Sequence, residues 1–445
     1  MIILGLGTNI GNRLQNLRTV LKKLKQCEKI SIIKTSPIYE SDALLTENAH
    51  SSWNLPYLNL AVSCETSFSP EELYSQIKTI EQQMGRPKDY PIWSPRLIDI
   101  DILAWHSMVI KTAKLSIPHV GLHERPFALW PLEDVYPNWI FPNQELYGKT
   151  IQEIVAPWGS KFTGNAPLHT KQIAHRIDCS QIVGILNITP DSFSDGGIYN
   201  VVDKAIEQAK YLYASGAEII DIGAESTRPG HTSPLSPLTE WKRLKPVLQE
   251  ISKYWNSNNG PIISIDTRNA ETAAKAIALS KIDWINDVTG FDNHDMLKLA
   301  AETPVKLLFM HSMSIPPTTN ITLPKNSDPI NELISWTEKK IEVFDKEGIT
   351  QDRLIFDPGI GFGKTKEQNF TIIKRAEEFK KLSIPILIGH SRKSFLNMFT
   401  EQSPCDRDIE TIALSSYLSY KNVDYLRVHN VDWHLRAFKT IAAIY

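Results

Sequence analysis

Eight short apolar runs between Ile182 and Asn430 each end in a cluster of polar residues. The polar ends are Asn187, Asp221, Asp266, Asn286 with Asp287, His311, Asp357, Ser391 to Lys393, and Arg427 to Asn430. Segments with helical spacing of apolar residues lie between the runs, for example at 201–215 and 269–279. Strand and helix alternating eight times is typical of a closed parallel barrel, whose strand C-termini meet at one mouth. The sequence therefore predicts a (β/α)8 TIM barrel with one polar site at that mouth.

Residues 1–140 alternate differently and are expected to form a separate N-terminal domain. A barrel of this kind takes about 250 residues. We therefore assign 178–445 to the barrel and 141–177, which is rich in proline and glycine, to a partly ordered linker. The expected N-terminal strands are 2–7, 30–39, 57–66 and 97–105, and the expected helices are 12–27 and 70–84. This order indicates a small α+β domain with a ferredoxin-like arrangement.

Composition excludes several classes of partner. The formal net charge is −2, so bulk electrostatics gives no reason to expect nucleic acid or a membrane surface as a partner. The four cysteines, Cys27, Cys64, Cys179 and Cys405, show no metal-binding or CxxC spacing, which favours reduced thiols in a cytoplasmic protein. No apolar run reaches the ~20 residues that cross a membrane, and no signal or transit peptide is expected ahead of the strand-like segment 1–7.

Two aspartates alternate with isoleucines in Ile98-Asp99-Ile100-Asp101-Ile102. On a strand, Asp99 and Asp101 share one face about 6.6–7 Å apart while the isoleucines bury the other. Two such carboxylates can bind Mg²⁺, which completes its coordination with substrate phosphates. An ordinary solvated strand face is the alternative. Cationic and aromatic neighbours favour the metal and a phosphorylated ligand: Arg86, Lys88, Trp93 and Arg96 upstream, and His119, Arg125 and Phe127 downstream.

The N-terminal domain resembles 6-hydroxymethyl-7,8-dihydropterin pyrophosphokinase. The resemblance rests on GLGTNIGNR at 5–13, YLNLAV at 57–62, IEQQMGR at 80–86, WSPRLIDIDIL at 93–103 and IPHVGLHERPFALWPLEDV at 117–135. It implies transfer of the terminal pyrophosphoryl unit of ATP to the pterin hydroxymethyl group, with two Mg²⁺ held by Asp99 and Asp101. It also implies ATP binding by Glu81, Arg86, Trp93, Arg96, His119 and Arg125, with Arg86 and Arg96 catalytic, and pterin binding by Tyr57, Asn59 and Phe127. The chain departs from the family pattern at Ile92, where arginine is usual, and at Ser41-Asp42-Ala43, where threonine and two prolines are usual.

The polar residues at the barrel mouth fall into two chemical groups. One group is cationic and rich in donors, which suits pyrophosphate: Asn187, Thr227, Arg228, Arg427 and His429. The other group, Asp266, Asn286, Asp357 and Lys393, can match the row of donors and acceptors on the edge of a pterin. A helix cap or a loop hydrogen bond is the alternative for any one aspartate. Four such groups on separate strand ends favour a binding site.

Residues from about 180 to 445 resemble dihydropteroate synthase. The motifs are ILNITPDSFSDGG, GAEIIDIGAESTRPG, ISIDT, INDVTG, LIFDPGIGFGKT, GHSRKSFL and RVHN. The resemblance implies displacement of pyrophosphate from dihydropterin pyrophosphate by the amine of 4-aminobenzoate, with one Mg²⁺ at Asn187 and with Lys393 and Arg228 catalytic. It assigns Phe193, Pro229, Phe362 and Ser391 to the aminobenzoate side, implies inhibition by sulfonamides, and allows for a homodimer through the barrel helices. Asn430 stands where aspartate is commoner, so we expect His429 to lack its usual orienting carboxylate.

The product of the first expected reaction is the substrate of the second, so the leading interpretation is a bifunctional enzyme of folate biosynthesis. One alternative is a pterin-binding barrel that carries a folate for methyl transfer, which should lack the Ser391–Lys393 motif and the loop at 227–230. A non-catalytic descendant of these enzymes is the other. The presence of Asp99, Asp101, Arg228 and Lys393 argues against it.

Overall fold

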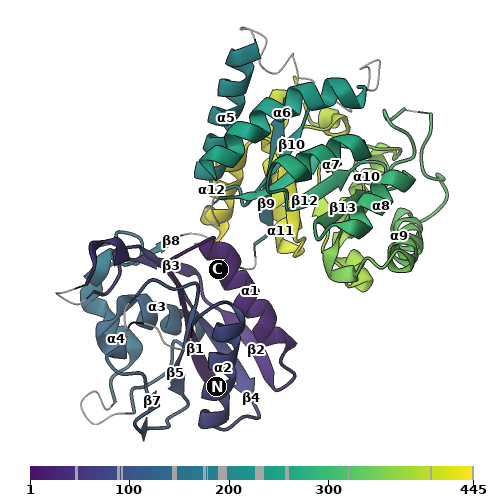
Figure 1. Cartoon of the computed structure of the whole chain (residues 1–445). Helices are drawn as coiled ribbons and strands as arrows, with labels where there is room; N and C mark the ends of the chain where they lie inside the picture. Colours follow the sequence, from purple (N-terminus) through teal and green to yellow (C-terminus); the bar gives the residue numbers. More distant parts are fainter. Residues whose placement is uncertain are drawn as a thin grey trace. The chain divides into compact units, whose positions relative to one another are not determined.

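The computed structural model divides the chain into two compact units, Met1–Ile177 with Lys439–Tyr445, and Asp178–Phe438 (Figure 1). The described residues are 1–45, 49–87, 91, 94–142, 148–173, 177, 179–188, 198–225, 235–255, 260–318, 320–400 and 403–442. No helix among these residues is both long enough and apolar enough to cross a membrane.

The first unit is built on an antiparallel sheet with the strand order β5-β1-β4-β3-β8, and β2 also pairs with β4. The strands are β1 (Ile2–Thr8), β2 (Ile30–Thr35), β3 (Ile38–Ser41), β4 (Tyr57–Thr66), β5 (Asp99–Trp105) and β8 (Lys171–Ile173). The helices are α1 (Arg13–Gln26), α2 (Pro70–Gln83), α3 (Pro126–Val135) and α4 (Ile151–Val155), and β6 (Ile110–Lys111) pairs with β7 (Ser116–Ile117).

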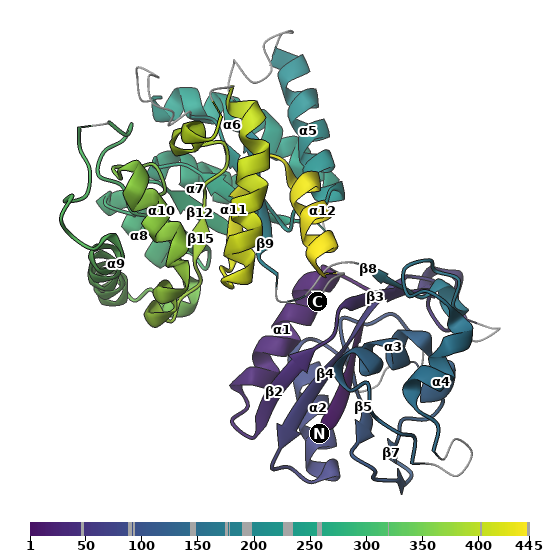
Figure 2. The ribbon, with the colours of Figure 1, turned by 180° about the vertical axis from the view of Figure 1, so that it is seen from behind.

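Side-chain alternation along β1 places helices on both faces of this sheet. Ile2, Leu4 and Leu6 pack in one apolar cluster with α1 and α2, whereas Ile3 packs in a second cluster with α3 and α4. Figure 2 shows α3 and α4 on the opposite side of the sheet from α1. Local signals agree with these helices, since Ser69 and Glu72 form a capping box ahead of α2. The predicted α+β, ferredoxin-like class is confirmed.

The single strand predicted over 30–39 is wrong in one detail. Two strands, β2 and β3, pair with successive parts of β4 and are separated at Ser36 and Pro37. Proline has no N–H to continue a ladder, and the Ser36 N–H donates to the Ala61 carbonyl at 2.9 Å. The expected linker at 141–177 contains α4 and β8 and lies within the first unit. The domain boundaries themselves stay a prediction.

The second unit is a parallel barrel, as predicted. Its strands run in the order β14-β13-β12-β11-β10-β9-β16-β15, and the Phe356 N–H donates to the Pro385 carbonyl at 2.9 Å beside β15, which brings the two ends of the sheet together. The strands are β9 (Gln181–Asn187), β10 (Ile219–Gly223), β11 (Ile262–Asp266), β12 (Trp284–Asp287), β13 (Lys306–Met310), β14 (Leu354–Asp357), β15 (Leu387–Ile388) and β16 (Tyr425–Val428).

Helices surround this barrel (Figure 1). They are α5 (Ile198–Ala214), α6 (Pro237–Tyr254), α7 (Ala270–Leu279), α8 (His294–Glu302), α9 (Pro329–Lys346), α10 (Lys366–Lys374), α11 (Asp408–Tyr420) and α12 (Val431–Ala442). A layer of inward-facing apolar side chains fills the barrel, including Ile219, Trp284, Ile355 and Tyr425. The residues two positions later on these strands point inward above that layer. They are Asp221, Asn286, Asp357 and Arg427.

Candidate active sites

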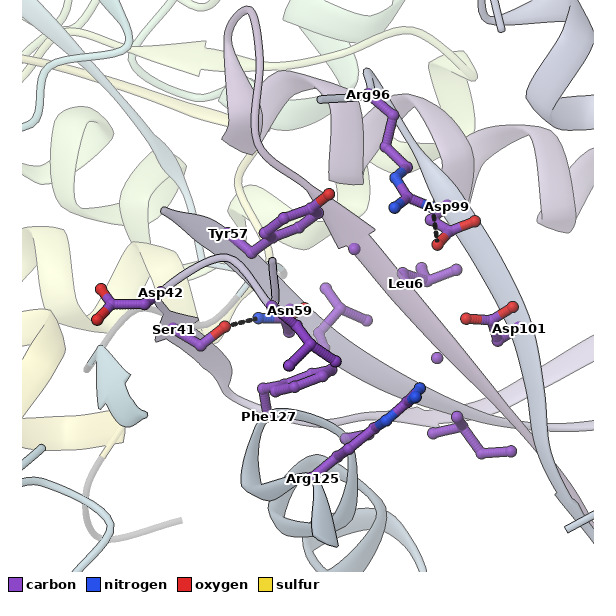
Figure 3. Close-up of a pocket in the computed structure, with 16 residues that line it drawn as sticks. Leu6, Ser41, Asp42, Tyr57, Asn59, Arg96, Asp99, Asp101, Arg125 and Phe127 are labelled. Carbon is purple, nitrogen blue, oxygen red and sulfur yellow. Dashed lines mark hydrogen bonds and ion pairs between the residues drawn. The ribbon is translucent and has the colours of Figure 1, made fainter. Parts of the chain in front are cut away.

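The first unit contains a hollow whose walls come from β1, the end of β3, β4, β5 and the first turn of α3 (Figure 3). Its lining includes the predicted residues Tyr57, Asn59, Arg96, Asp99, Asp101, Arg125 and Phe127. Strand alternation explains the two aspartates, because Ile100 and Ile102 are buried on the other side of β5. The structure therefore brings both ends of the predicted site, the carboxylates and the pterin-facing rings, into one cavity.

Asp99 and Asp101 have opposite electrostatic surroundings. Asp99 accepts from Arg86 and from Arg96, each at 2.6 Å. Burial raises the pKa of Asp99, but Arg96, Lys78 and Arg86 outweigh it and leave that pKa below its usual value. For Asp101, burial and then the neighbouring Asp99 raise the pKa, and His119 lies 4.0 Å away. A carboxylate whose pKa is raised by a second carboxylate beside it favours a bound cation.

Glu81, which the resemblance assigns to ATP binding, is buried beneath the site. Its side chain is 2% exposed, and its carboxylate accepts from the Ile100 N–H at 2.7 Å and from Lys78 at 2.8 Å. Its second oxygen lies 2.7 Å from Arg86. A direct contact with ATP does not fit this burial. Glu81 instead fixes Arg86 and the β5 backbone beside the two aspartates.

A second hollow lies on the other side of Asp101. It is lined by Tyr74, Lys78, Lys114, Ser116 and His119, together with residues of β5. Arg125 is close to this side, since its guanidinium is 3.5 Å from the His119 ring. Sequence reasoning missed Lys78 and Lys114 because lysines on a helix and in a loop look like ordinary solvated residues. Their common position beside Asp101 depends on the fold.

The other end of the first hollow is aromatic. In Figure 3 the rings of Tyr57 and Phe127 lie on either side of Asn59. The Asn59 amide donates to the Ser41 hydroxyl at 3.1 Å, and Ser41 is buried. Asp42 also lines the hollow. The departure at 41–43 from the resembling family therefore falls within the wall of this cavity.

The mouth of the barrel holds a cavity of about 380 Å³, a size that suits a small organic ligand. Its lining includes the predicted residues Asn187, Asp266, Asn286, Asp357, Phe362, Ser391, Lys393, Arg427 and His429. These come from strand ends that the barrel closes into one ring, as the sequence predicts.

Asp221 is a member of this site that sequence reasoning did not assign a role. It is fully buried and accepts from Ser264 at 2.6 Å and from Asn286 at 3.0 Å. The Arg427 guanidinium donates to Asp221 and to Asp266, each at 2.6 Å. The signal was present, because Asp221 interrupts an apolar run two residues before its end. Its ion pair with Arg427 also holds that arginine beside the aspartates at the mouth of the barrel.

Asp357 and Lys393 face the same cavity from β14 and from the turn after β15. Burial raises the pKa of Asp357, and its carboxylate accepts from the Gly359 N–H at 2.7 Å. Burial lowers the pKa of Lys393 to about 8, and Arg427 adds to the shift. The Lys393 ammonium donates to the Ile360 carbonyl and lies 4.6 Å from the centre of the Phe362 ring.

Phe362 belongs to the loop at 359–363, which the buried Lys364 holds by hydrogen bonds to backbone carbonyls. Lys364 donates to the carbonyls of His311 and Phe362 at 3.1 and 2.9 Å, and its amine lies 2.9 Å from the His311 ring. Burial lowers the pKa of His311 to about 3, assisted by Lys364. Gly359 has φ of 67°, and a Cβ there would lie 1.9 Å from the His311 oxygen. Only glycine allows this close approach.

His429 contacts a hydroxyl, since its Nδ1 lies 3.0 Å from the Ser391 hydroxyl. The neighbouring Asn430 amide donates to Asp408 of α11 at 3.4 Å. The expectation that His429 lacks its usual orienting carboxylate stays a prediction. Burial acts against ionisation of Asp408, but bonds from Arg392 hold its pKa below the usual value, with smaller contributions from Asn430 and His429.

Several predicted residues lie outside the described part of the chain. They are Lys88, Ile92 and Trp93 in the first unit, and Phe193, Thr227, Arg228 and Pro229 in the second.

Comparison with known proteins assigns each of the two parts of the chain to a protein family. Residues 3–137 match the family model of 7,8-dihydro-6-hydroxymethylpterin-pyrophosphokinase, and residues 183–429 match that of pterin binding enzymes. The folate synthesis bifunctional protein of Chlamydia caviae is 36% identical over 99% of this chain and 97% of its own length. This chain belongs to the family of bifunctional folate synthesis proteins. It combines a pyrophosphokinase domain with a dihydropteroate synthase domain, so the leading interpretation is confirmed over the methyl-transfer module and the non-catalytic descendant.

Solved structures match the barrel of this folate synthesis protein. Dihydropteroate synthase from Clostridium difficile, with pteroic acid, is 36% identical and covers 60% of this chain and 97% of that one, with a TM-score of 0.55. The Xanthomonas albilineans synthase with 4-aminobenzoic acid is 30% identical and covers 60% of this chain and 93% of that one, with a TM-score of 0.54. The predicted TIM barrel is confirmed.

Proposed function

We propose that the two cavities carry out consecutive steps on one pterin. In the first, the hydroxyl oxygen of 6-hydroxymethyl-7,8-dihydropterin forms a bond to the β-phosphorus of ATP, the bond from that phosphorus to AMP breaks, and the hydroxyl proton passes to solvent. In the second, the amine of 4-aminobenzoate forms a bond to the pterin methylene carbon while its C–O bond to pyrophosphate breaks, and the amine loses a proton to solvent. The observation that carries this proposal is that each cavity joins cationic groups for phosphates to groups that suit a pterin.

In the first cavity, Asp99 and Asp101 would hold Mg²⁺, and we propose two ions. The contrast between the two carboxylates supports this fit, since Asp101 lies beside a like charge and is 39% exposed to the cavity, whereas Arg86 and Arg96 donate to Asp99. Bound Mg²⁺ would neutralise charge on the phosphates during transfer. Arg86, Arg96, His119 and Arg125 would bind the phosphates of ATP, with Trp93 at its base. Tyr57, Asn59 and Phe127 would hold the pterin.

In the second cavity, Asp357 and Asn286 would bond the pterin edge, and Lys393 would donate to its carbonyl. Arg427 would neutralise the charges of Asp221 and Asp266 and donate its remaining N–H to pyrophosphate. The other residues that would bind pyrophosphate are Asn187, Thr227, Arg228 and His429. Asn187 would bind one Mg²⁺ carried in by the pyrophosphate, because an amide oxygen suits that ion. Phe362, Ser391, Phe193 and Pro229 would enclose aminobenzoate and exclude water.

Lys393 gives the synthase a pH dependence that can be measured. Its pKa is lowered to about 8 by burial, with Arg427 adding to the shift and Asp357 opposing it. The ammonium is therefore present below about pH 8 and lost as the pH rises through that value. We expect kcat/KM of the synthase step to fall above about pH 8, and the fall to shift to higher pH in Lys393→Arg. A profile that stays flat to pH 10 in the unmodified chain would remove Lys393 from this role.

Sulfonamides are expected to bind the synthase more tightly once pyrophosphate is present. The cavity that would receive them is lined by Arg427 and Asn187, which would also bind pyrophosphate, so we expect binding of one ligand to favour binding of the other. We expect a gain in sulfonamide affinity of about tenfold or more. Isothermal titration of the full chain with and without pyrophosphate and Mg²⁺ measures this gain, and equal affinities would contradict it.

Three further properties complete the proposal. We infer a kinase domain that ends before 178 and a barrel domain from 178 to 445. A homodimer through the barrel fits the exposed apolar side chains of α11 and the turn ahead of it, among them Phe399, Ile409 and Tyr420; the molar mass in solution tests this. A cytoplasmic location fits the reduced thiols of Cys27 and Cys64.

A further inference from the structure

The segment between the two matched domains adds a strand to the kinase sheet. The family models stop at residue 137 and resume at 183, so neither covers residues 148–173, here called the connecting segment. Within it, β8 pairs antiparallel with β3, with Glu40 opposite Lys171 and Ile38 opposite Ile173. The Gln172 N–H donates to the Lys161 carbonyl at 2.6 Å. Because successive N–H groups of a strand point to opposite sides, those of Lys171 and Ile173 face β3.

The connecting segment also forms polar contacts with Asp42, the residue that follows β3. The Asp42 N–H donates to the Leu168 carbonyl at 2.8 Å, and the Asp42 carboxylate lies 2.6 Å from the His169 ring. Leu168 and His169 have φ of 59° and 46°, a conformation that is costly for residues other than glycine and persists where surrounding contacts impose it. Ser41 and Asp42 line the kinase cavity. The segment therefore supports one wall of that cavity.

The same segment is anchored to the opposite wall. Lys161 lies 2.8 Å from Glu133 and 2.6 Å from Asp134 at the end of α3, the helix whose first turn carries Phe127. Asp134 also accepts from the buried Tyr39 hydroxyl at 2.6 Å, on β3. Ile151, Val155 and Ala166 pack in the apolar cluster of α3. Both walls of the pterin end, β3 and α3, are thus bonded to one segment.

We propose that the connecting segment is a positioning element of the pyrophosphokinase, which sets the separation of the two walls that hold the pterin, and not only a tether between domains. The inference rests on the proposed placement of the pterin between Tyr57 and Phe127. We expect its effect mainly on the pterin side. Asp99 and Asp101 belong to β5, and Arg86 and Arg96 to the chain between α2 and β5; Arg125, which directly precedes α3, is the phosphate-side residue nearest to the segment's anchor.

Lys171→Pro in the full chain tests this positioning role. It removes the Lys171 N–H that faces β3, whereas Lys171→Ala keeps that N–H and removes only a half-exposed side chain. We expect Lys171→Pro to raise KM for the pterin by about tenfold, corresponding to one lost backbone bond and a displaced wall. KM for ATP, and synthase activity on supplied dihydropterin pyrophosphate, should stay within about twofold, as should every constant of Lys171→Ala.

Phe127→Ala separates this inference from the function on which it depends. If Phe127→Ala raises KM for the pterin and Lys171→Pro does not, the positioning role is wrong and the pterin site stands. If neither variant changes that KM, the pterin site is misplaced. Should Lys171→Pro fail to fold, hydrogen exchange of the unmodified chain decides. Pterin with a non-hydrolysable ATP analogue should slow exchange at 166–173 relative to the analogue alone, and equal exchange would overturn the inference.

Discussion

Asp101→Ala is expected to abolish pyrophosphokinase activity, lowering the rate by about a thousandfold or more. The substitution removes the carboxylate that lines the cavity beside Asp99, and with it a ligand for the Mg²⁺ that would stabilise charge on the transferring phosphates. Such stabilisation is worth several kcal/mol, and each 1.36 kcal/mol is tenfold in rate. The measurement is the formation of AMP from ATP with saturating hydroxymethyl-dihydropterin and Mg²⁺.

The fold should survive this change. Burial and Asp99 raise the pKa of Asp101, so its ionised form does not stabilise the fold. Its removal should leave the thermal midpoint unchanged or slightly higher. Glu65→Ala is the matched control, because Glu65 is an exposed carboxylate on β4 of the same sheet; it should leave the rate within about twofold. Near-normal AMP formation by Asp101→Ala would contradict the metal assignment.

Arg427→Met is expected to destabilise the barrel and to stop the synthase step. The guanidinium is bonded to Asp221, which has no exposed surface, and to Asp266, whose pKa burial raises to about 7 against the opposing effect of Arg427. Removing one partner of a buried ion pair costs about 3–5 kcal/mol, because the remaining charge is left uncompensated. Hydrogen exchange of the β10 and β11 amides reports this loss for the barrel itself.

Arg375→Met provides the comparison for that effect. Arg375 also contacts two carboxylates, those of Asp328 and Glu378, but all three side chains are about one-third exposed. Ion pairs of this kind contribute about 0–1 kcal/mol, so exchange and synthase activity should change little. Equal effects of the two substitutions would show that the Arg427 network has no special role.

Much of the barrel site could be predicted because strand ends carry their own signal. Asn187, Asp266, Asn286, Asp357 and Arg427 each end an apolar run, and closure of a parallel barrel brings such ends together whatever the details of packing. The same holds for Asp99 and Asp101, whose alternation with isoleucine requires only that the segment be a strand.

Contacts between distant segments could not be predicted in this way. Asp408 lies on a helix about twenty residues before Asn430, so nothing in the sequence near Asn430 shows that its amide donates to that carboxylate. Glu81 lies near the end of α2, where the sequence gives no sign of burial, because its burial follows from the packing of α2 against β5. Residues 141–177, which include the connecting segment, were expected to be a linker because prolines and glycines recur along them. Its pairing with β3 depends on an edge that only the folded sheet presents.

Quantifying the pterin species made by three full-length chains tests most directly whether one chain carries two separate sites. Each chain receives ATP, Mg²⁺, hydroxymethyl-dihydropterin and 4-aminobenzoate, and the products are separated by chromatography with mass detection. The unmodified chain should yield dihydropteroate, and Lys393→Ala should accumulate dihydropterin pyrophosphate. Asp101→Ala should form neither, yet convert supplied dihydropterin pyrophosphate at the normal rate. Loss of both activities in either folded variant would contradict the assignment of two independent sites.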